Sequence, residues 1–417
     1  MKKPAYFIAA ILSALLLCSC TNGGEELPED NTANHWGSPI METDKGYFSN
    51  AVNYMYLRYY EKNSDNELFL CARPECMHEG GDGCTATYKG LRVVNTLMYD
   101  GSIYIYTVGE EDGTVAFSLY RAAADGTTIT KVGDAFSVEN SAGEDYDFFS
   151  LHFIIHKGKA YLPYHLKFGG STYGFAGSGL VEMDIFTGKT KQISSGESYF
   201  SPYPRELQGS GEYVYFDWSS YNTPTQTKAY NINTGEIKEV MFFQAAGKDR
   251  CYSWASYDDG TAGLYAFPKD LEVSEDPEHT YEEMELIIEK FDGKPSEIMY
   301  YDGKIIVAFD EKIEIYDETG AFIDRIETAS LTAGASERTG DIYLYYAASG
   351  DKLFVKAMNT NFNDPVSDRI YSVPFDNFES GWELAYEIKE YYIIENERGS
   401  DYMYSVAFGW TWDTVME

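Results

Sequence analysis

The sequence predicts an all-β protein built from repeated pairs of β-hairpins. Tyr (37), Phe (24) and Trp (6) make up 16% of the 417 residues, and aromatic residues suit the pleated, half-buried surface of a sheet. A turn containing glycine, followed by a Tyr-rich alternating stretch, recurs along the chain. Helical periodicity is nearly absent, because only residues 281–290 fit it, and these read equally as an acidic loop leading into a strand.

The turns occur in two interleaved sets. The glycines of the first set are 57, 53, 49, 43 and 37 residues apart, at Gly101, Gly158, Gly211, Gly260, Gly303 and Gly340. A second set lies between them, at Gly126, Gly188, Gly235, Gly293 and Gly320. Glycine supplies the positive φ that tight hairpins need, and alternating stretches on both sides indicate paired strands. Two hairpins per unit are typical of a four-stranded propeller blade.

We therefore expect a β-propeller of four-stranded blades. Residues 39–90 supply a degenerate first unit, which makes seven blades, and an eighth is left open. The rival fold is a pair of stacked β-sandwiches. A strand from the tail, residues 382–412, is expected to close the ring against the first blade, since closure removes an open sheet edge. The turns at 184–189 and 231–236 resemble those of bacterial quinoprotein-like and TolB-like propellers, a resemblance that implies the fold and no particular activity.

The N-terminus has the pattern of a secretory signal. Lys2 and Lys3 precede an apolar run over residues 5–17, which is too short to span a membrane. The following Leu-Cys-Ser-Cys resembles the lipobox of bacterial lipoproteins, which implies diacylation (palmitate-type chains) of a new N-terminal cysteine. Cys20 is the better acceptor than Cys18, because the residue before the cut must be small. We expect a signal peptide over 1–19, a flexible acidic tether over 20–38 and the propeller over 39–417, held outside the cytoplasm at the bacterial membrane or cell surface.

The net charge of −35 limits the partners of the protein. Such a field repels nucleic acid and anionic membrane surfaces, so we expect no nucleic-acid partner and contact with the membrane through the lipid only. Divalent cation binding is a weaker interpretation than solubility, because the sequence contains no Asp-x-Asp-x-Asp-Gly loop.

The expected second turns of the blades are long, at residues 107–116, 167–179, 217–228, 269–285 and 359–368. Second turns share one face of a propeller, and insertions gathered on one face of a repeat protein commonly build its binding surface. The alternative is that they are surface loops of variable length. The aromatic candidates for ligand binding on this face are Phe168, Tyr173, Phe175, Trp218, Tyr221, Tyr281 and Phe362.

Cys71, Cys76, His78 and Cys84 form the only dense group of soft ligands. Three thiolates and one imidazole suit a structural zinc ion, whereas cysteines of exported proteins more often form disulfides, for which Cys251 is the only other candidate in the domain. A free or redox-active thiol is the third alternative. The segment is predicted at the third turn of the first blade, in a structural role, and it resembles segments of uncharacterised propeller lipoproteins of gut Firmicutes. The spacing does not fit covalent haem, and no other cofactor is predicted.

No reacting group stands out in the sequence. It has no Gly-x-Ser-x-Gly elbow before a helix, and its carboxylates are too numerous to single out a glycosidase pair. We expect a non-catalytic binding or scaffold module for a glycan, a peptide or a protein partner. One alternative is a carbohydrate-active lyase or hydrolase with its site on the long-loop face, near His152, His156 or His165. Another is a subunit of an envelope-assembly complex.

Overall fold

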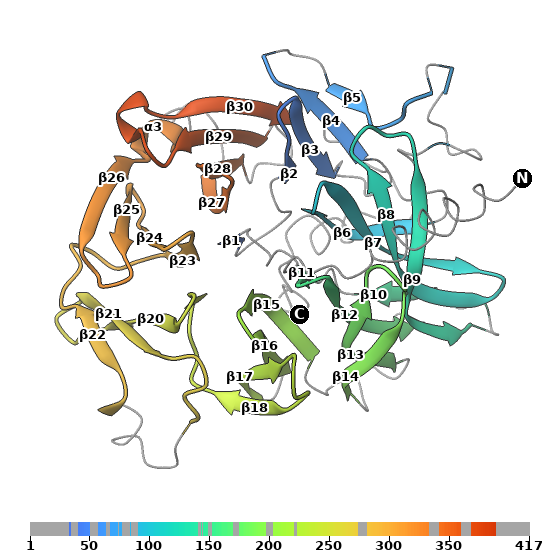
Figure 1. The fold of residues 1–417 in the computed structure, drawn as a ribbon, viewed down its shortest axis with the longest axis horizontal. Helices are drawn as coiled ribbons and strands as arrows, with labels where there is room; N and C mark the ends of the chain where they lie inside the picture. Colours follow the sequence, from blue (N-terminus) through green and yellow to red (C-terminus); the bar gives the residue numbers. More distant parts are fainter. Residues whose placement is uncertain are drawn as a thin grey trace, which may run out of the picture.

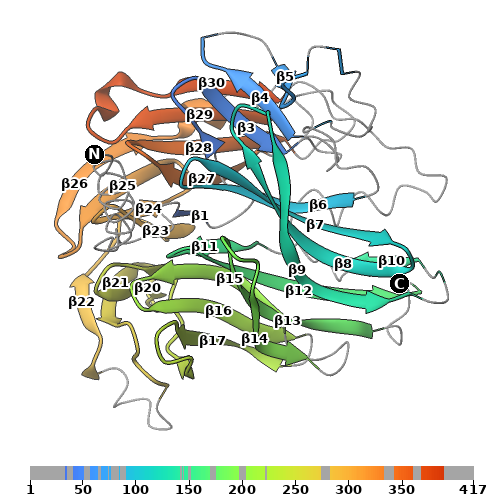
Figure 2. The same ribbon diagram turned by 45° about the vertical axis from the view of Figure 1, so that its right-hand side comes forward.

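The computed structural model is a seven-bladed β-propeller, which confirms the predicted fold class (Figure 1). It describes residues 33–34, 41–50, 57–63, 67–73, 75–76, 84, 91–140, 143, 145–148, 152–169, 175–196, 203–220, 223–273, 282–332, 342–359 and 368–388. Seven sheets stand around a common axis, and within these residues there is neither an eighth blade nor a stacked sandwich. Figure 2 shows the same ring from the side of the second and third blades.

The first four blades take their strands in chain order from the axis outward. The first blade consists of β2 (Met41–Glu42), β3 (Gly46–Asn50), β4 (Leu57–Glu61) and β5 (Glu67–Phe69). The second consists of β6 (Leu91–Tyr99), β7 (Ser102–Glu111), β8 (Thr114–Ala123) and β9 (Ile129–Glu139). In the third, the inner strand is split into β10 (Tyr146–Phe148) and β11 (Ile154–His156), followed by β12 (Lys159–Phe168), β13 (Phe175–Asp184) and β14 (Thr190–Gly196). The fourth consists of β15 (Tyr203–Ser210), β16 (Tyr213–Ser220), β17 (Thr223–Asn231) and β18 (Ile237–Val240).

The last three blades follow the same order. The fifth consists of β19 (Ala245–Ala246), β20 (Arg250–Ser256), β21 (Ala262–Pro268) and β22 (Glu285–Ile288). The sixth consists of β23 (Glu297–Tyr301), β24 (Lys304–Ala308), β25 (Lys312–Asp317) and β26 (Phe322–Glu327). The seventh consists of β27 (Ile342–Ser349), β28 (Lys352–Asn359), β29 (Asp368–Pro374) and β30 (Glu383–Ile388). The helical elements among the described residues are α3 (Ala329–Thr332) and η2 (Phe378–Ser380), and no described helix is long and apolar enough to cross a membrane.

The core lies between the blades. Each of the seven buried apolar clusters joins two neighbouring blades, so both faces of the strands within a blade are covered. In β7, for example, residues 102–109 are all buried. The turns between strands use the left-handed backbone that the sequence predicts, as at Asp100 (φ 47°) and Gly101 (φ 68°).

The ring closes through contacts between the first and seventh blades. Tyr386 of β30 stacks on Tyr47 and Tyr60, with ring centroids 5.1 and 4.7 Å apart. Lys352 of β28 donates to Glu42 of β2 at 2.9 Å. In addition β1 (Ala33–Asn34), which falls within the range predicted as tether, pairs with β27 near the axis. The tail segment beyond residue 388, predicted to close the ring, lies outside the described residues.

Four turn assignments were wrong because the residues of a turn do not show its order within a blade. Gly260 lies in the second turn of the fifth blade, between β20 and β21, and the long connection over 269–284 is the third turn. Gly293 lies in the link between the fifth and sixth blades. The first turn of the seventh blade contains Gly350 (φ 59°), and Gly340 precedes β27.

The second turns are shorter than expected. β7 and β8 are joined by Asp112 and Gly113 alone, and β16 and β17 by Tyr221 and Asn222, because the strands continue into stretches that the sequence suggested as loops. The connection over 169–174 in the third blade and that over 360–367 in the seventh are longer. We call the face of the ring that carries these connections the second-turn face.

Candidate functional site

Glu297 is a buried acid at the axis of the propeller. It is the first residue of β23, the inner strand of the sixth blade, and therefore lies at the end of that strand nearest the second-turn face. Its backbone is paired in register with Ala308 of β24, and the residue is 9% exposed. Its Oε1 has no hydrogen-bond partner among the described residues. A buried acceptor of this kind is costly unless a partner occupies it.

Two inner strands of other blades bring groups near Glu297. Burial raises the pKa of Glu297 to about 8, and the charge of Glu206 on β15 adds to the increase. Glu206 has φ 47° and lies at the irregularity of β15 between Arg205 and Gln208. Burial also raises the pKa of Tyr346 on β27, with Glu297 as the next cause. The fourth, sixth and seventh blades thus each contribute to one polar group at the axis.

This axial group, Glu206, Glu297 and Tyr346, suits a cationic partner. With a pKa of about 8, the carboxyl of Glu297 is mostly neutral at pH 7. An approaching ammonium or guanidinium would favour the ionised form and provide the missing donors, since charge-assisted hydrogen bonds are stronger than neutral ones.

The three histidines suggested as catalytic candidates make contacts in different directions. His152 contacts the amide Nδ2 of Asn95 in the second blade through its Nδ1, at 2.6 Å, and burial lowers the pKa of His152 to about 4. The Nε2 of His156 lies 2.9 Å from the carbonyl oxygen of Gly211 in the first turn of the fourth blade. His165 lies on β12 and is buried. The described contacts of His152 and His156 therefore lead to opposite neighbouring blades.

Two of the seven predicted aromatic residues have described side chains, and both take part in packing between blades. Phe168 ends β12 and packs partly buried against the cluster between the second and third blades. Trp218 packs against the cluster between the third and fourth blades, with the ammonium of Lys228 5.3 Å from its ring centroid. Phe175 begins β13, and its side chain is not among those that the structure describes. Tyr173, Tyr221, Tyr281 and Phe362 lie outside the described residues, so their role in binding stays a prediction.

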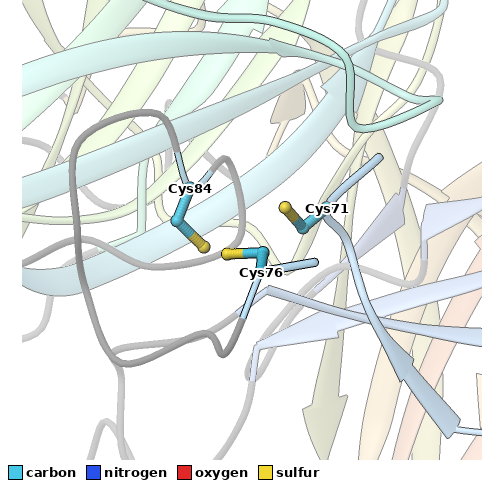
Figure 3. A group of neighbouring side chains, drawn as sticks. All are labelled: Cys71, Cys76 and Cys84. Carbon is cyan, nitrogen blue, oxygen red and sulfur yellow. The ribbon is translucent and has the colours of Figure 1, made fainter. Parts of the chain in front are cut away.

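The three cysteines predicted as ligands come together. Their Sγ atoms all lie within 4.8 Å of one another, and Figure 3 shows the side chains of Cys71, Cys76 and Cys84 converging. Cys84 is buried, and Cys71 and Cys76 are partly exposed. The cysteine segment follows β5, so it belongs to the link between the first and second blades and not to the third turn of the first blade. The prediction of its position failed because the two-residue inner strand β2 was not recognised, so β5 is the fourth strand of the blade and not the third.

The backbone around Cys71 joins these two blades. The amide of Cys71 donates to the carbonyl oxygen of Phe69 at 2.7 Å, and that of Ala72 donates to the carbonyl oxygen of Gly126, in the third turn of the second blade, at 3.2 Å. His78 lies outside the described residues. Cys251 lies on β20, buried between the fourth and fifth blades, and is not part of the cysteine group.

Glu297 is not among the residues that the sequence predicts to be functional. The available signal was an acid immediately before the apolar start of an inner strand, Ile298 and Met299. That signal is weak in a chain with 67 acidic residues, and only the packing of three blades makes this acid buried.

The chain is similar in fold to several solved propellers. No protein-family model matches it, and no curated protein matches it. A prolyl endopeptidase structure has 9% identity and a TM-score of 0.45 over 92% of this chain and 55% of its own, so the chain spans about half of that protein. An uncharacterised protein from Listeria monocytogenes has 12% identity and a TM-score of 0.37, covering 64% of this chain and 78% of its own. TolB from Acinetobacter baumannii has 10% identity and a TM-score of 0.31, covering 75% and 67%. These likenesses concern the fold alone.

Proposed function

We propose that the protein is a lipid-anchored, extracytoplasmic propeller that binds a peptide or protein partner at the axial end of its second-turn face and catalyses no reaction. The observation that carries the binding proposal is the buried carboxyl of Glu297, whose Oε1 has no hydrogen-bond partner among the described residues. A lysine, an arginine or an N-terminal amine of the partner would pair with it.

The charge of the protein supports a basic partner. A net charge of −35 attracts a cationic chain over a distance and speeds its encounter. A neutral glycan, which the sequence leaves open, offers hydroxyl donors without charge, and its binding would depend little on salt. The lipid anchor rests on the signal-like N-terminus and the cysteine at position 20.

The binding proposal is tested with the full chain in detergent against an array of basic, neutral and acidic peptides and neutral oligosaccharides. We expect basic peptides to bind, with affinity falling as salt rises. Replacing Glu297→Gln should weaken binding about tenfold or more, the usual effect of removing a charge-assisted hydrogen bond. Glu272→Gln is the matched control, since this acid is exposed and pairs only with Lys238 among the described residues. Equal binding by both variants, or binding of oligosaccharides alone, would count against the proposal.

The anchor is tested separately. We expect Cys20→Ser to move the protein from the membrane fraction to the soluble fraction, and mass spectrometry of the native protein to find an acylated cysteine at its N-terminus. An unmodified, intact N-terminus would contradict the anchor without affecting the binding proposal.

A further inference from the structure

We propose that Cys71, Cys76 and Cys84 bind one zinc ion, which fastens the first blade of the propeller to the second. The sequence alone left zinc, a disulfide and a reactive thiol open. The arrangement of the three sulfur atoms favours zinc.

The distances among the sulfur atoms fit a tetrahedral metal site. Zinc binds thiolates at about 2.3 Å, which places two sulfur ligands about 3.8 Å apart in a tetrahedron. The three Sγ atoms lie within 4.8 Å of one another, so small side-chain adjustments bring all three to that separation. Soft thiolate ligands select zinc over magnesium or calcium, which prefer oxygen. The three sulfur atoms supply three of the four positions of such a site.

A disulfide accounts for only two of the three sulfurs. It would leave the third cysteine within 4.8 Å of the bond, in reach for thiol–disulfide exchange. Cys251 cannot take up this third cysteine, because it is buried on the fifth blade. A metal ion uses all three sulfurs, and its binding releases their protons without any oxidant.

The position of the group gives the metal a structural role. Leu70, the residue before Cys71, is buried in the cluster between the first and second blades. The backbone of Leu70 and Cys71 passes so close to Gly126 that a Cβ there would lie 3.1 Å from Leu70 and 3.2 Å from Cys71. A metal ion at the cysteines would therefore hold the link against the second blade. The first blade has strands of only two to five residues, so it gains most from such a constraint.

The test begins with the full-length wild-type protein, purified without chelators. We expect one zinc per chain by elemental analysis. We also expect three thiols that react with a thiol reagent under native conditions only after a chelator removes the metal. Cobalt in place of zinc should give the intense visible absorption of tetrahedral cobalt with thiolate ligands. These measurements need no variant and do not depend on the partner-binding proposal.

The variants Cys71→Ser, Cys76→Ser and Cys84→Ser should each lower the bound zinc at least tenfold, whereas the control Cys251→Ala should keep it. Removing the metal should lower the midpoint of thermal unfolding, and zinc should restore it. After removal of the metal, the rate of hydrogen exchange should increase in β3 and β4 of the first blade earlier than in the fifth blade. A wild-type protein with no zinc and a disulfide between two of these cysteines would overturn the proposal. Three reduced cysteines that take up neither zinc nor cobalt would overturn it equally.

Discussion

Replacing Glu297 by glutamine should remove part of the pH dependence of stability. The pKa of Glu297 is raised by burial from its ordinary value of 4.5 to about 8. Between these values the folded protein holds a proton that the unfolded chain has released. Stability therefore falls as pH rises from about 4.5, and the loss is complete above about 8. At about 1.36 kcal/mol per pKa unit, the upper limit of the loss is roughly 5 kcal/mol, and relaxation around the charge reduces it.

The assay compares urea unfolding of the wild type, Glu297→Gln and the exposed control Glu272→Gln between pH 5 and pH 8, followed by tryptophan fluorescence. Glutamine has the shape of the neutral acid and cannot ionise. We therefore expect similar midpoints for Glu297→Gln and the wild type at pH 5, and a more stable variant at pH 8, by about 2 kcal/mol or more. Glu272→Gln should follow the wild type throughout. Parallel curves for Glu297→Gln and the wild type across this range would refute the inferred burial of the charge.

Three further substitutions test the contacts between blades. Gly126→Ala should lower both the thermal stability and the bound zinc more than Gly303→Ala does. Both glycines have positive φ, but only Gly126 has backbone atoms within 3.2 Å of the position that a Cβ would take. Equal losses of thermal stability and of metal in the two variants would contradict the close approach at Gly126. His156→Ala should lower the free energy of unfolding by about 1–3 kcal/mol, since the ring fills a buried site and contacts a carbonyl oxygen. A stable variant that has lost the turnover of a polysaccharide would instead favour an enzyme. Lys352→Met should speed hydrogen exchange in the first blade, because it removes the bond to Glu42, and unchanged exchange rates there would contradict its role in closure.

The residues of the turns show why the fold was predictable and the order of turns was not. Gly101 and Gly303 were identified correctly as first turns, because positive φ and flanking alternation are properties of a few neighbouring residues. Gly260 has the same local signature but joins the second and third strands. Which hairpin a turn belongs to depends on which strand reaches the axis, and no short stretch of sequence determines that.

The candidate sites divide in the same way. The cysteines were visible as a group because they fall within 14 residues, although their position in the link between blades was missed. The ligand-binding role expected of Trp218 stays a prediction, and the structure adds that its ring packs against the cluster between the third and fourth blades. Glu297 was not predicted, because nothing in its neighbours distinguishes it from the other acids of the chain.

By itself the sequence determined the class of fold and the grouping of the cysteines, since hairpins and close spacings arise from residues near one another in the chain, and it left seven and eight blades open. Only the tertiary structure decided that β1 pairs with β27 and that one acid among many is buried at the axis. The physical reason is that these features need several blades to pack together, so they depend on residues far apart in the sequence.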